Sequence, residues 1–181
     1  MKNFLLSFLL LIVLLPASNL SAQGAENVVL ITFDGLRWQE VFGGIDQNLA
    51  THKNYSPQTE LLMQRFWHSN SNDRAQALLP FIHNTVFSQG IYAGNRHENS
   101  CAAVSNDWYF SYPGYSEILT GVINPNINSN SKVPNTEITF LELLESNSLY
   151  KAQTAAFASW DVFPFIFNVQ RSGVHVNAFS V

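Results

Sequence analysis

Ser111 and Asp34 are the two residues whose types and positions could do chemistry. Ser111 lies two residues before Pro113, at the start of a helical run that Gly121 would end. The unpaired N–H groups at a helix N-terminus favour an anion such as phosphate next to that hydroxyl. Asp34 ends an apolar run, and a carboxylate is a hard oxygen ligand for a divalent metal. Each also has a simpler interpretation, Ser111 as a helix N-cap and Asp34 as part of a turn with Gly35.

Apolar periodicity predicts strands and helices in alternation around these two residues. Residues 27–33 form a continuous apolar run with β-branched members, which indicates a strand buried on both faces. Asp34 would then lie at the carboxyl end of that strand, where open α/β sheets bind ligands. The other expected elements are strands at 90–94 and 152–159 (the latter buried), helices at 35–42, 56–68, 73–89 and 136–148, and a helix or turn at 160–168. The alternation predicts an α/β fold with a mostly parallel sheet flanked by helices.

Local signals set the ends of several of these elements. Gly43 and Gly44 are expected to close the helix at 35–42. Either Asn72 or Asp73 could cap the helix at 73–89, and Pro80 predicts a kink or a fresh start within it. Residues 123–135 are rich in Asn, Ser and Pro and are therefore predicted to be a loop.

The first 22 residues have the features of a secretory signal peptide. Lys2 supplies the positive charge, residues 4–15 are apolar apart from Ser7, and Pro16 and small residues follow. The apolar run is shorter than the roughly 20 residues that a transmembrane helix needs. We therefore expect the mature protein, from residue 23, to be periplasmic or secreted, with no stable membrane anchor after cleavage.

Composition narrows the possible functions. The chain has 181 residues, of which 46% are hydrophobic and 12% charged, so it is expected to fold rather than remain disordered. The net charge is −4 and the sequence has no cluster of Lys or Arg, which argues against a nucleic-acid partner. Cys101 is the single cysteine, so neither an internal disulfide nor a thiolate metal cluster is expected.

Two motifs together resemble the alkaline phosphatase superfamily, especially its exported bacterial members similar to nucleotide pyrophosphatases/phosphodiesterases. "LITFDGLR" resembles the first-strand motif, with Asp34 at the position of a metal ligand. "FSYPGYSEILTG" resembles the nucleophile segment, with Ser111 as nucleophile. "RWQEVFGG" and "ASWDVFPF" also resemble stretches of such members, and the resemblance covers residues 27–181.

The resemblance implies a fold and a mechanism. Residues 23–181 would be the N-terminal part of an alkaline-phosphatase-like catalytic domain, with a sheet that is incomplete at the C-terminus. The implied reaction is hydrolysis of a small phosphate ester, in which Ser111 attacks phosphorus and a phosphoseryl intermediate forms. Two divalent metal ions, usually zinc in this superfamily, would assist, with Asp34 and Ser111 as ligands of one of them.

The sequence also departs from the family pattern. Gly114 stands where diesterase-type members are expected to have an asparagine that supplies an oxyanion donor, so that donor is missing or comes from elsewhere. Tyr115 replaces the arginine that sulfatases need, which argues against maturation to formylglycine. Arg37 is expected to form a structural ion pair, Trp160 to pack, and Asp161 to cap a helix.

The remaining metal ligands of such a site are not recognisable in the sequence. The five histidines (His52, His68, His83, His97 and His175) form no ligand pair near a predicted strand end and are expected to have structural or surface roles, with His97 as the best candidate ligand among them. We therefore expect the N-terminal part of a longer enzyme. A truncated, non-catalytic remnant or binding module of the same fold is the alternative.

Overall fold

The computed structural model describes residues 24–178, so the expected signal peptide at 1–22 lies outside the described residues. The chain divides into two compact units, Met1–Phe33 and Asp34–Val181. In the first unit, residues 27–33 are neither a strand nor buried. The five large apolar side chains of this run are 55–87% exposed: Val28, Val29, Leu30, Ile31 and Phe33.

The prediction of a buried strand at 27–33 is therefore wrong for the described chain. Apolar, β-branched residues favour an extended backbone, but a strand forms only where a neighbour pairs with its N–H and C=O groups. The sheet of the described residues consists of β1 (Ala155–Ala158) and β2 (His175–Ala178), which pair with each other.

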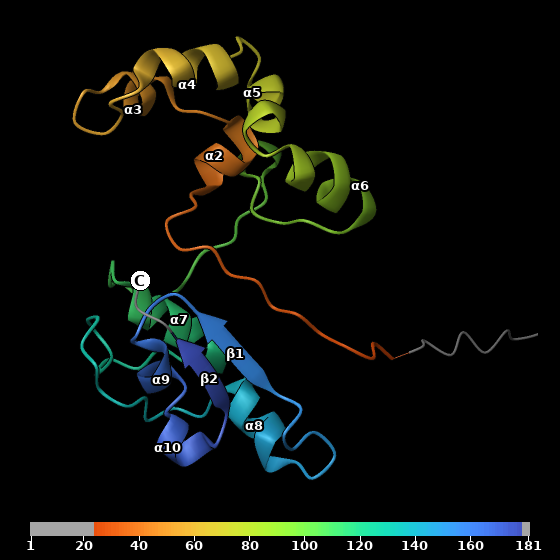
Figure 1. The fold of residues 1–181 in the computed structure, drawn as a ribbon, viewed down its shortest axis with the longest axis vertical. Helices are drawn as coiled ribbons and strands as arrows, with labels where there is room; N and C mark the ends of the chain where they lie inside the picture. Colours follow the sequence, from red (N-terminus) through yellow and green to blue (C-terminus); the bar gives the residue numbers. More distant parts are fainter. Residues whose placement is uncertain (1–23, 179–181) are drawn as a thin grey trace, which may run out of the picture. The chain divides into compact units, whose positions relative to one another are not determined.

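A group of short helices follows in the second unit (Figure 1). They are α2 (Trp38–Gly43), α3 (Gln47–Thr51), α4 (Thr59–Phe66), α5 (Ser71–Leu78), the π-helix η1 (Ile82–Val86) and α6 (Phe87–Gln89). The helices predicted at 35–42 and 56–68 are confirmed as α2 and α4, and α2 packs against α5.

The helix predicted at 73–89 is interrupted at Leu79 and starts afresh at Pro80, as expected because proline cannot donate a backbone hydrogen bond to the preceding turn. The predicted cap is wrong. Asn70 caps α5, because its side chain accepts hydrogen bonds from the N–H groups of Asn72 and Asp73. Residues 90–94 are not a strand, and the 3-10 helix η2 (Arg96–Glu98) follows them.

The remaining elements are a small parallel sheet and the helices that lie beside it (Figure 1). They are α7 (Ser111–Thr120), α8 (Phe140–Ser146), β1, α9 (Phe163–Ile166), α10 (Val169–Ser172) and β2. β1 pairs with β2 in parallel, with Ala155 opposite His175. The described chain is thus a mixed α/β structure. The strand predicted at 152–159 exists but is not buried, since Phe157 is 76% exposed.

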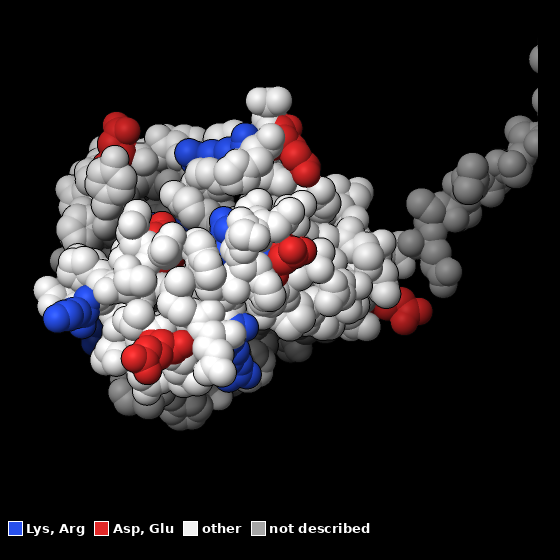
Figure 2. All heavy atoms as spheres, turned by 90° about the horizontal axis from the view of Figure 1, so that it is seen from above, with Lys and Arg blue, Asp and Glu red and all other residues white. Residues whose placement is uncertain are grey.

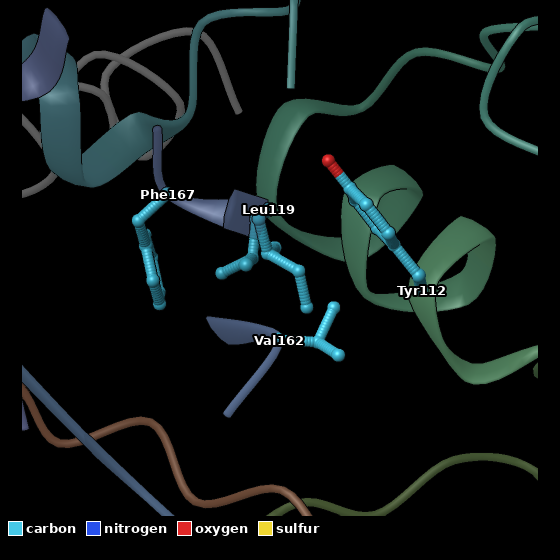
Figure 3. Packing of buried hydrophobic residues seen from close by; sticks show 5 residues of the cluster. Tyr112, Leu119, Val162 and Phe167 are labelled. Carbon is cyan, nitrogen blue, oxygen red and sulfur yellow. The ribbon is translucent and has the colours of Figure 1, made fainter. Parts of the chain in front are cut away.

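The hydrophobic core of the part that contains α7 to β2 lies between α7 and α9. Figure 3 shows Tyr112 and Leu119 of α7 near Val162 and Phe167, which flank α9. Ile166, within α9, is fully buried in the same cluster. Because these side chains come from two segments about 45 residues apart in sequence, their packing fixes α7 against α9.

The distribution of surface charge and the length of the helices complete the description of the fold. On the face shown in Figure 2, acidic and basic side chains are interspersed among uncharged ones. None of the helices within residues 24–178 is both long enough and apolar enough to cross a membrane.

Candidate active site

Ser111 is the first residue of α7, and its hydroxyl is free of the capping role that its position could have given it. The residue at the N-cap is Phe110, whose extended backbone (φ −124°, ψ 149°) precedes the helix without a side-chain cap. Within residues 24–178 the Ser111 hydroxyl has no hydrogen-bond partner, and the residue is half-buried. The interpretation of Ser111 as an N-cap is therefore wrong, and the hydroxyl remains available for chemistry.

The helix carrying Ser111 begins and ends as its sequence predicts. Pro113 lies in the first turn, where its missing N–H costs no helical hydrogen bond. Gly121 ends α7 in the left-handed conformation (φ 72°, ψ 10°), and its N–H bonds to the carbonyl of Glu117 at 2.8 Å.

Tyr112 anchors this helix start from within. Its side chain is only 1% exposed, and its hydroxyl donates to the carbonyls of Val133 at 2.7 Å and Phe165 at 3.3 Å. Burial raises the pKa of Tyr112 to about 12, so the phenol stays a neutral donor at physiological pH. The residue directly after Ser111 is therefore held by two other segments of the chain, the loop at Val133 and α9.

Asn130 is a site residue that the sequence analysis did not identify. Its Oδ1 accepts a hydrogen bond from the backbone N–H of Tyr112 at 3.0 Å. The oxygen must face this N–H, because only the oxygen of the amide can accept, so Nδ2 is left as a donor next to the helix start. The local signal was weak, since Asn130 lies in the Asn/Ser-rich loop at 123–135, which the structure confirms as a loop.

The role predicted for Asp161 is also wrong. It was expected to cap a helix, but the residue at the N-cap of α9 is Val162, with no side-chain cap. Asp161 instead forms an ion pair with Lys132, between Oδ2 and Nζ. The pairing residue lies 29 positions away, so no pattern near Asp161 could have indicated it. Trp160 packs against Phe163, as expected.

The loop before Ser111 is held by Glu117 of α7. The two carboxylate oxygens accept hydrogen bonds from the N–H groups of Ser105 at 2.6 Å and Asn106 at 3.0 Å, and Asn106 Nδ2 donates at 2.8 Å. These bonds, led by that of the Asn106 side chain, lower the pKa of Glu117 below its ordinary value of 4.5. An ionised Glu117 is thus needed to hold the segment that leads into α7.

We predict that acid breaks the hydrogen bonds that Ser105 and Asn106 donate to the Glu117 carboxylate. Because the pKa of Glu117 is depressed by folding, its contribution to stability is complete above the unfolded-state value and is lost as the pH falls through the lower folded-state value. The amide ¹H resonances of Ser105 and Asn106, followed by NMR, should therefore move as the pH is lowered below about 4.5. Glu117→Gln should show little movement. Resonances that stay fixed down to pH 2 in the unsubstituted protein would contradict this assignment.

Asp34 lies in an exposed turn with Gly35, whose positive φ of 75° suits the tight turn predicted for the pair. No hydrogen bond or ion pair within residues 24–178 involves the Asp34 carboxylate, and none joins this residue to Ser111. Arg37 forms the expected structural ion pair, with Glu40. Its Nε donates to Glu40 Oε2 at 2.8 Å, which raises the pKa of the guanidinium.

Structural contacts are made by the histidines His97, His83 and His52. His97, the best candidate ligand among them, packs edge-on against Trp38, with ring centroids 5.4 Å apart. His83 Nε2 lies 2.7 Å from the carbonyl of Val41. His52 stacks on Tyr55 at 4.4 Å. Among the described residues, the His, Cys, Asp and Glu side chains form no group of three or more that could hold a metal ion.

Comparisons with family models, with curated protein sequences and with solved structures find no match for this chain. The geometry at the start of α7 therefore carries the functional interpretation together with the resemblance of the two motifs.

Proposed function

We propose that this chain is a phosphoric ester hydrolase of the phosphatase or phosphodiesterase type, exported to the periplasm or secreted, in which Ser111 is the nucleophile. The observation that carries the proposal is the state of the Ser111 hydroxyl. It is half-buried at the first position of a ten-residue helix and has no hydrogen-bond partner in the described chain, while the residue after it is held by three hydrogen bonds.

The proposed reaction is a double displacement at phosphorus. The Ser111 hydroxyl gives up its proton as its oxygen attacks phosphorus, and the ester oxygen leaves and takes up a proton, which gives an alcohol and a phosphoserine. Water then attacks the phosphoserine and releases the free serine together with phosphate from a monoester, or with a phosphate monoester from a diester. The helix N-terminus favours the negative charge of the phosphoryl oxygens. The Nδ2 group of Asn130 is a candidate for the oxyanion donor that Gly114 cannot supply.

Metal dependence enters the proposal from the two sequence motifs. A two-metal centre needs several carboxylate and histidine ligands, and residues 24–178 contain no group of three such residues. Asp34 by itself is one ligand. The described residues therefore do not fit a complete two-zinc centre. Zinc dependence and an alkaline-phosphatase-like core remain part of the proposal on the strength of the two motifs.

The test is hydrolysis of p-nitrophenyl phosphate and bis-p-nitrophenyl phosphate by the full chain, with and without added zinc. Ser111→Ala is expected to lower kcat/KM by at least about 10³-fold, because no other group replaces the attacking oxygen. Ser71→Ala is a matched control, since Ser71 is also the first residue of a helix, α5. It should leave the rate unchanged.

Two results would contradict the proposal. Equal rates in Ser111→Ala and the unsubstituted chain would exclude Ser111 as nucleophile. No hydrolysis under any condition would favour the alternative, a non-catalytic remnant or binding module of the same fold. Mass spectrometry after reaction with substrate adds an independent readout, because one phosphoryl group should be found on the peptide that contains Ser111.

A further inference from the structure

We infer that Lys132, positioned by Asp161, determines the charge preference of the Ser111 site and favours phosphate monoesters, which carry two negative charges, over diesters, which carry one. The inference rests on the proposed function, because it names the substrate class of that same site. Its starting observation is the ion pair between Lys132 and Asp161, which the sequence did not predict.

Lys132 lies in a short stretch of loop that is tied to the start of α7 on both sides. Two positions before it, Asn130 Oδ1 accepts from the Tyr112 N–H at 3.0 Å. One position after it, the Val133 carbonyl accepts from the Tyr112 hydroxyl at 2.7 Å. The first bond reaches the backbone of Tyr112 at the helix start, and the second reaches the hydroxyl at the tip of its side chain. The loop is therefore held on both sides of Lys132 by the residue next to Ser111.

Asp161 reaches the same place through the core. The residue after it, Val162, is 2% exposed and belongs to the buried cluster that also contains Tyr112. The Phe165 carbonyl in α9 accepts from the Tyr112 hydroxyl at 3.3 Å. The packing of α9 on α7 thus brings the Asp161 carboxylate to the ammonium group of Lys132.

The ion pair is open to a small solute. The side chains of Lys132 and Asp161 are 49% and 43% exposed. An ammonium group has three N–H donors, and this pair occupies one of them. A pair with this exposure contributes little to stability, so removing it should not unfold the protein.

Lys132 is also the cation that remains available in this part of the structure. Arg171 is fully engaged, because it forms a two-bond pair with Glu142 and donates to the carbonyls of residues 135–137. The donors at the start of α7, the helix N-terminus and the Asn130 amide, carry no full charge. They suit one negative charge, whereas a second charge needs a cation to compensate for its lost hydration.

The test is binding of inorganic orthophosphate and of dimethyl phosphate to the full chain, with and without zinc, by isothermal titration calorimetry near pH 8. Orthophosphate is then mostly a dianion, and dimethyl phosphate is a monoanion. Lys132→Met should weaken orthophosphate binding about tenfold and dimethyl phosphate binding less than about threefold. Lys132→Arg should restore most of the loss. Lys151→Met, a change at another exposed lysine, should have no effect.

Asp161→Asn separates this role from a purely structural one. It removes the negative charge that competes with phosphate for Lys132, so it should strengthen orthophosphate binding about two- to fivefold. A structural ion pair would instead give both Lys132→Met and Asp161→Asn a lower Tm and the same direction of change in binding. That result, unchanged binding in Lys132→Met, or no orthophosphate binding by the unsubstituted chain would overturn the inference.

Hydrolysis measured with the same variants distinguishes failure of the inference from failure of the proposed function. Ser111→Ala should bind orthophosphate but not hydrolyse esters. If the Lys132 and Asp161 variants shift binding as expected while no variant shows Ser111-dependent hydrolysis, the anion site stands and the hydrolase proposal fails. If hydrolysis depends on Ser111 but the monoester-to-diester ratio of kcat/KM is unchanged in Lys132→Met, the hydrolase proposal stands and the assignment of Lys132 fails.

Discussion

Replacing Gly44 with alanine is expected to lower the free energy of unfolding by about 3–5 kcal/mol, through backbone strain and overpacking together. Gly44 follows α2 with φ 73° and ψ −160°, a conformation that residues with a side chain rarely adopt. A Cβ atom at this position would lie 2.3 Å from the carbonyl carbon of Arg74 and 2.5 Å from the nitrogen of Ala75. Because those atoms are backbone, α5 would have to move away from α2.

Gly43→Ala provides the matched control. Gly43 is the last residue of α2, and a Cβ atom there would meet nothing within 4 Å. Since alanine has the higher helix propensity, the change should be neutral or stabilising by up to about 1 kcal/mol. Urea unfolding of both variants, followed by circular dichroism, measures the difference. A Gly44→Ala variant within about 1 kcal/mol of Gly43→Ala would show that the contact with α5 yields easily.

Replacing Asn135 with alanine is expected to cost about 3 kcal/mol, because it leaves the buried Ser116 hydroxyl and the partly buried Glu137 N–H without partners. Asn135 is fully buried. Its Nδ2 donates to Ser116 Oγ at 3.0 Å, and its Oδ1 accepts from the Glu137 N–H at 2.9 Å. Ser116 is itself 2% exposed, so water cannot readily replace the lost donor. The substitution would loosen α7 from the loop that carries Asn130 and Lys132.

Asn128→Ala tests whether the effect comes from burial rather than from the residue type. Asn128 is exposed in the preceding stretch of loop, and its only side-chain bond among the described residues is a long one, 3.5 Å to the Pro125 carbonyl. Its loss should change the free energy of unfolding by no more than about 0.5 kcal/mol. Thermal unfolding of the two variants gives the comparison. Equal Tm values would mean that the hydrogen bonds of Asn135 are replaced when it is removed.

Elements whose ends depend on nearby residues could be predicted from the sequence. Pro113 and Gly121 placed the start and the end of α7, and Pro80 placed the break after α5. Each acts through its own backbone conformation or its missing N–H, so the signal and its effect lie within one helical turn. Gly44 belongs to the same class as a helix stop, although its close approach to Arg74 could not be inferred.

Strand formation could not be predicted in the same way. Residues 27–33 have the stronger apolar pattern, yet they are exposed, while His175–Ala178, with a weaker pattern, forms β2. A strand depends on a neighbour that can lie far away in sequence, and hydrophobic periodicity does not name that neighbour. β2 forms because it lies alongside β1, twenty residues earlier in the chain.

The features of the candidate site fall into the same two classes, those set by nearby residues and those set by contacts between distant segments. The sequence by itself determined that Ser111 stands at a helix start and that Asp34 stands in a turn with glycine, because both follow from local backbone preferences. Only the tertiary structure decided that Asn130 meets the Tyr112 N–H and that Lys132 pairs with Asp161. These contacts join residues 18 and 29 positions apart, and the second of them also depends on how α9 packs against α7 in the shared core.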